Sequence, residues 1–165
     1  MIAGVAFAAQ IILKKLGRTT RMAAEFVGAV ALTSTAAAAY YVATGRLDAR
    51  AWMLWLVNWL FAVDQIHFVW LRIRGARTKE LGEKFKIGWS FLAGQMILAA
   101  ILALAYDLGW LPELALIAFA PLLFRGFVWF AKGPQPLVVR QLGWTELAHA
   151  LVFGLLLSVS FTFVR

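Results

Sequence analysis

Six long apolar runs, at residues 1–13, 22–44, 51–71, 85–106, 112–131 and 142–164, occupy most of this 165-residue sequence. Hydrophobic residues make up 63% of the chain, whereas a soluble domain averages about 45–50%. A bilayer span needs about 20 apolar residues, and lipid leaves unpaired backbone groups without partners, so each run is expected to be helical. The sequence therefore predicts an all-α, polytopic transmembrane helix bundle of about six helices, forming a single domain over residues 1–165.

The first run is shorter than the others. Its 13 residues would extend about 20 Å as a helix, against a hydrocarbon core of roughly 30 Å. Such a helix could be tilted or re-entrant, or the chain could begin part-way through a longer protein. We expect the second of these.

The charged residues predict the orientation of the chain. The formal net charge is +8, but the basic residues lie between apolar runs, which favours a membrane topology signal over nucleic-acid binding. Most of the 16 Lys and Arg residues lie in or near the first, third and fifth connections. The positive-inside rule then predicts that both termini are non-cytoplasmic, in a multi-pass protein of the bacterial cytoplasmic (inner) membrane.

Several polar residues fall inside the predicted spans, where ionisable groups are costly and are candidates for function. They form a candidate intramembrane cluster: Glu25, Asn58, Asp64, Gln65, His67, Glu146 and His149. Ion pairing and hydrogen bonding between helices would also account for these residues.

Asp64–His67 and Glu146–His149 each have an acid-x-x-His spacing, which is found in di-iron helix bundles. The full carboxylate set of such a site is missing, so no metal site is predicted. No cofactor is firmly predicted either, although His67 and His149 leave open a haem, a pigment or a metal.

Arginines near the predicted cytoplasmic boundary are candidate residues for binding lipid headgroups: Arg72, Arg74, Arg77 and Arg125. They could act as orientation determinants that touch anionic headgroups. They could also bind a phosphate or diphosphate at the mouth of a polar cavity, because the guanidinium fork matches phosphate oxygens.

The chain has eight tryptophans and thirteen phenylalanines, more than six short helices need for internal packing. Two stripes are candidate partner-facing surfaces: Trp52, Trp55 and Trp59, and Phe124, Phe127 and Phe130. Interfacial anchoring would account for part of this aromatic content.

Three segments of the C-terminal two-thirds resemble the YwiC-like family of bacterial integral membrane proteins. They are FVWLRIRGARTKELGEKFKIGWS, PELALIAFAPLLFRG and RQLGWTELAHALVFG. The resemblance implies a membrane location and a helical fold, and it implies no particular chemistry. Members of the family usually open with a His-Gly-Ala-Trp segment and further N-terminal helices, which this sequence lacks.

The residues favour a non-catalytic function over an enzymatic one. We expect an accessory or structural subunit of a larger membrane assembly, such as an electron-transfer or pigment-bearing complex, with lipids and other membrane subunits as partners. The alternative is a small membrane enzyme or carrier that handles a lipid or isoprenoid at a cytoplasmic-side polar cavity. A transporter is less favoured, because no inverted halves or broken-helix pairs are evident.

Overall fold

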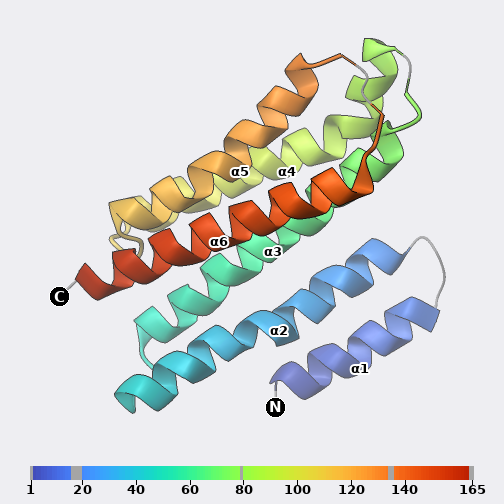
Figure 1. Cartoon of the computed structure of the whole chain (residues 1–165). Helices are drawn as coiled ribbons and strands as arrows, with labels where there is room; N and C mark the ends of the chain where they lie inside the picture. Colours follow the sequence, from blue (N-terminus) through green and yellow to red (C-terminus); the bar gives the residue numbers. More distant parts are fainter. Residues whose placement is uncertain (1, 16–19, 79, 134–135, 164–165) are drawn as a thin grey trace. The chain divides into compact units, whose positions relative to one another are not determined.

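The computed structural model describes residues 2–15, 20–78, 80–133 and 136–163, and it is almost entirely helical (Figure 1). Six α-helices follow one another along this part of the chain: α1 (Ile2–Lys15), α2 (Arg21–Thr44), α3 (Ala49–Gly75), α4 (Leu81–Asp107), α5 (Glu113–Ala131) and α6 (Val139–Phe163). The predicted all-α class is therefore confirmed. Met1 and Val164, the outer ends of two predicted spans, lie outside the described residues.

Five of the helices in the described part of the chain, α2 to α6, are long and apolar enough to cross a bilayer. Helix α1 has 14 residues and falls short of that length, as its sequence predicted. The fold is thus that of a multi-pass membrane protein by the length and composition of its helices. The side on which each terminus lies stays a prediction.

The helices extend beyond the apolar segments from which they were predicted. Helix α3 begins two residues earlier and ends four residues later than the run 51–71, and α4 begins four residues before the run 85–106. Backbone hydrogen bonding does not stop where hydropathy falls, and Arg, Lys and Glu are good helix formers. Helix α2 ends at Thr44 and is capped by Gly45, whose φ of +69° is left-handed and whose N–H donates to the carbonyl of Tyr41.

Contacts divide the chain into two compact units, of which the first is Met1–Ile66. Here α1 packs antiparallel along α2 (Figure 1), and Gly28 on α2 lies so close to the Gln10 side chain that a Cβ would overlap it. The first part of α3 contacts α2 through two indoles. Trp55 Nε1 donates to the carbonyl of Val30 at 3.2 Å, and Trp59 Nε1 donates to that of Phe26 at 3.3 Å.

The second unit, His67–Arg165, holds the end of α3 together with α4, α5 and α6. Helix α5 packs against both α4 and α6 (Figure 1). An aromatic and aliphatic core joins all four segments: Phe68, Leu71, Phe91, Phe130 and Leu142. Gly126 on α5 allows the ring of Phe91 to approach, because a Cβ there would lie 2.8 Å from Phe91 Cε1. This core supports the candidate site described next.

Candidate functional site

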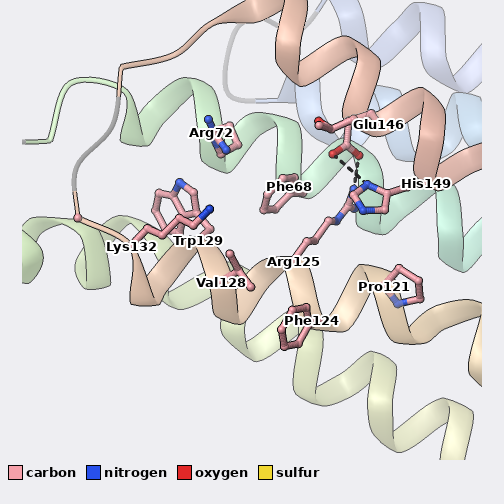
Figure 2. Close-up of a pocket in the computed structure, with 12 residues that line it drawn as sticks. Phe68, Arg72, Pro121, Phe124, Arg125, Val128, Trp129, Lys132, Glu146 and His149 are labelled. Atoms are coloured by element: carbon pink, nitrogen blue, oxygen red, sulfur yellow. Dashed lines mark hydrogen bonds and ion pairs between the residues drawn. The ribbon is translucent and has the colours of Figure 1, made fainter.

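A cavity of about 380 Å³ lies within the second unit, where α3, α5 and α6 meet (Figure 2). We call it the basic cavity. Its lining residues are Phe68, Arg72, Pro121, Phe124, Arg125, Val128, Trp129, Lys132, Gly133, Thr145, Glu146 and His149. The volume lies within the range of about 300–1,000 Å³ that is usual for small-molecule sites.

Helical periodicity explains how each helix supplies its side chains to the basic cavity. On α5, Pro121, Arg125 and Trp129 are spaced by four residues and therefore share one face. Phe68 and Arg72 are related in the same way on α3. Helix α5 continues through Pro121, which lines the cavity although it has no N–H to donate to the preceding turn.

Arg125 and Glu146 form an ion pair in the lining of the basic cavity, with a hydrogen bond from the guanidinium to Glu146 Oε2. Both side chains are largely buried, at 7% and 13% exposure. The guanidinium carbon of Arg125 also lies 4.4 Å from the ring centroid of Phe68, a cation–π arrangement. A buried arginine is tolerable here because a carboxylate and an aromatic face replace its hydration.

His149 extends this pair on α6. Its Nδ1 lies 3.8 Å from Glu146 Oε1, so the carboxylate faces a guanidinium with one oxygen and an imidazole with the other (Figure 2). The imidazole is 26% exposed, more than its carboxylate neighbour. It is therefore the titratable member of the group with the greater access to the surroundings.

Among the described residues, three cationic side chains and one carboxylate line the basic cavity. The cations are Arg72, Arg125 and Lys132, and the carboxylate is Glu146. Since Arg125 is paired with Glu146, Arg72 and Lys132 give the lining an excess of positive charge. The remaining walls are mostly apolar, with Phe68, Phe124 and Val128 among them. This arrangement can bind an anionic group and accommodate an apolar chain beside it.

Lys84 on α4 supports the wall of the basic cavity. Its buried ammonium donates hydrogen bonds to the backbone carbonyls of Trp129 and Lys132, at the C-terminal end of α5. Those carbonyls have no partner within the helix, and the negative end of the helix dipole favours a cation there. Lys84 therefore fixes the segment that carries two of the lining residues.

The structure brings four of the sequence-predicted candidates together: Arg72, Arg125, Glu146 and His149 all line the basic cavity. Two of the predicted arginines do not. Arg74 lies over the ring of Trp70, 5.2 Å from its centroid, and Arg77 is exposed on the segment after α3.

His67 is not among the lining residues. Its Nε2 lies 3.4 Å from Ser90 Oγ, and its ring packs edge-on against Phe91. The basic cavity therefore contains one histidine and not the pair that a bis-histidine haem would need. In the described part of the chain, no group of three or more His, Asp or Glu residues could hold a metal ion.

The other predicted polar residues belong to the first unit: Glu25, Asn58, Asp64 and Gln65. Asn58 Nδ2 donates to the carbonyl of Leu54 at 2.7 Å, one turn earlier in the same helix. Asp64 is buried, and Glu25 and Gln65 are half-buried.

Three of the aromatic residues expected to face partners lie differently in the structure. Trp55 and Trp59 contact α2 of the same chain, because their indole N–H groups find backbone carbonyls there. Phe130 is buried and stacks on Phe85. Trp52, Phe124 and Phe127 are exposed, and their role as a partner-facing surface stays a prediction.

Sequence reasoning did not single out Phe68, Trp129 or Lys132 as site residues. Their signal was present in part, since Phe68 precedes Arg72 by one turn and Trp129 follows Arg125 by one turn. Which face of each helix turns inward was not evident from the sequence.

Fold and site together define a helical, membrane-type protein with a basic cavity in its second unit. Comparisons with models of protein families, with curated proteins and with solved structures gave no match.

Proposed function

We propose that this chain is a membrane-embedded binding protein or carrier for an amphiphile with an anionic headgroup. The observation that carries the proposal is the convergence of Arg72, Arg125 and Lys132 on one cavity with largely apolar walls. The headgroup would lie against the cations, and the hydrocarbon chain would lie along the apolar residues of α5.

The charges favour an anion over a neutral or cationic ligand. Arg125 is already paired with Glu146, so Arg72 and Lys132 supply the charge that a ligand would neutralise. The guanidinium of Arg72 can donate two parallel hydrogen bonds to a phosphate or sulfate, whereas Lys132 acts as a point charge.

The apolar walls favour an amphiphile over a free anion. Phe124, on the same lining, is 69% exposed, so the cavity meets the outer surface of α5 at an aromatic side chain. In a bilayer an exposed aromatic surface of this kind can contact an acyl or isoprenoid chain. A soluble anion such as inorganic phosphate would use only the polar half of the lining.

The segments that resemble the YwiC-like family overlap the same site. Its three segments, 68–90, 112–126 and 140–154, contain most of the residues that line the basic cavity. We propose membership of that family on the three segments alone.

Binding of a fluorescent phosphatidylglycerol to the purified protein in neutral detergent tests the proposal. Phosphatidylglycerol carries one negative charge, and zwitterionic phosphatidylcholine with the same label is the reference. Arg72→Ala should weaken phosphatidylglycerol binding roughly tenfold or more, because a charge-assisted hydrogen bond is worth about 1.5–3 kcal/mol. Arg74→Ala is the matched control, since Arg74 lies on the same helix outside the cavity.

Competition with inorganic phosphate distinguishes a lipid headgroup from a free anion. Displacement of the probe by micromolar phosphate would favour the free anion, and displacement only by unlabelled lipid would favour the amphiphile. The proposal is wrong if the protein binds both lipids equally, or if Arg72→Ala and Arg74→Ala have the same effect.

An accessory role in a larger assembly is a second candidate, and the surface of α6 favours it. Trp144, Leu151 and Leu155 are each at least 64% exposed on this helix, and Phe124 and Phe127 are exposed on α5. Native mass spectrometry of gently solubilised membranes tests this role. A stoichiometric subunit that co-purifies supports it, and a monomer that carries only lipid contradicts it.

A further inference from the structure

We infer that His149 is a proton-binding residue of the basic cavity and that it takes up a proton when an anionic headgroup binds. This inference rests on the proposed function and adds a regulatory property to the same site. It is carried by the position of one titratable side chain between a carboxylate and a cationic cavity.

The geometry identifies His149 as the group that can change charge. Its Nδ1 lies 3.8 Å from Glu146 Oε1, and its side chain lines the basic cavity on the same helix face. At this distance the carboxylate acts on the imidazole through its charge, since 3.8 Å is too long for a hydrogen bond from Nδ1. Imidazole is the side chain whose unperturbed charge change falls between about pH 5 and 8.

The charged groups that line the basic cavity together with His149 lie on α3 and α6 and on α5 with the residue that follows it. Glu146 on α6 favours the imidazolium, but Arg125 on α5 already neutralises much of that carboxylate. Arg72 on α3 and Lys132 at the end of α5 oppose a further positive charge. Lys84 on α4 is not among the lining residues, and its ammonium donates to the carbonyls of Trp129 and Lys132. An anion bound in the cavity would offset the charge of Arg72 and Lys132 and would so favour the imidazolium form of His149.

Proton and anion must then favour each other, because coupling between two binding equilibria is reciprocal. An anion in the cavity increases the protonated fraction of His149, and protonation of His149 increases the affinity for the anion. If one proton is taken up with each headgroup, the affinity should rise as the pH falls, by up to about tenfold per pH unit.

Measuring the affinity for fluorescent phosphatidylglycerol between about pH 5.5 and 8 tests this inference. The phosphodiester keeps its single charge over this range, so a change in affinity reports on the protein. The wild-type protein should bind about tenfold more tightly at about pH 6 than at about pH 7.5. His149→Gln should make the affinity independent of pH, and His67→Gln is the matched control because His67 does not line the cavity.

The chain contains two histidines, so the His67→Gln variant also provides a direct spectroscopic measurement. In ¹⁵N-histidine-labelled protein, the remaining imidazole signals belong to His149. Added phosphatidylglycerol should move its titration to higher pH, and phosphatidylcholine should not. This measurement keeps His149 in place, so it remains decisive if His149→Gln fails to fold.

The outcomes separate the inference from the proposed function. Selective binding of phosphatidylglycerol with an affinity independent of pH would overturn the inference and leave the proposed function standing. A titration of His149 that is unchanged by the lipid would do the same. Absence of selective binding at every pH would overturn both.

Discussion

The ammonium of Lys84 lies 4.3 Å from the ring centroid of Trp129 and donates a hydrogen bond to the backbone carbonyl of the same residue. Lys84 on α4 thus contacts both the indole ring and the backbone carbonyl of Trp129, near the end of α5. Lys84 is only 2% exposed, so no water can take over these interactions at low cost.

Lys84→Met should destabilise the second unit by about 1–3 kcal/mol, because two helix-terminal carbonyls lose a charged donor. Helicity measured by circular dichroism during unfolding in rising mole fractions of dodecyl sulfate would report the change. Lys86→Met, two residues along on the same helix, is exposed and should have little effect. Equal effects of the two substitutions would contradict this role for Lys84.

Removing one member of the Arg125–Glu146 pair should be more damaging than removing both. Glu146→Leu leaves a buried guanidinium without its carboxylate and should cost about 3–5 kcal/mol. The double variant Arg125→Met/Glu146→Leu should recover much of that loss, since it buries no charge. A double-mutant cycle of unfolding free energies measures the coupling. Additive effects would show that the two side chains do not stabilise each other.

Gly126→Ala should destabilise the core of the second unit by about 1–3 kcal/mol through overpacking. The added methyl would lie 2.8 Å from Phe91 Cε1, and Phe91 is fully buried against His67 and Phe68, so its ring has no room to move. Gly154→Ala on α6 is the control, because no other side chain lies within 4 Å of the position that its methyl would take. Unfolding free energies that do not differ between the two variants would disprove the close approach.

Trp55→Phe should lower the stability of the first unit by about 0.5–1.5 kcal/mol, because the hydrogen bond to the carbonyl of Val30 is lost. Trp89→Phe is the comparison variant, since Trp89 is 71% exposed. Proteolysis of the two variants in detergent gives the relative stability of the α2–α3 region. Trp55→Phe should be cleaved faster than Trp89→Phe. Faster cleavage of Trp89→Phe would contradict the expectation.

The helices were predictable because lipid allows few backbone arrangements. An apolar run such as 22–44 must satisfy its N–H and C=O groups internally, and a helix does so without a partner. The helix ends were less predictable. Helix α3 continues beyond the apolar run through Arg72 and Arg74 to Gly75, because hydrogen bonding persists after hydropathy has fallen.

The sequence by itself determined which side chains cost free energy when they are buried in a membrane. Arg125, Glu146 and His149 stood out inside apolar runs, and their cost in a membrane made them candidates before any contact was known. The tertiary structure alone decided which helix faces meet, since periodicity fixes relative positions within one helix but not its rotation against another. For that reason the sequence did not predict that Phe68 and Trp129 line the basic cavity, or that the indole of Trp55 contacts α2.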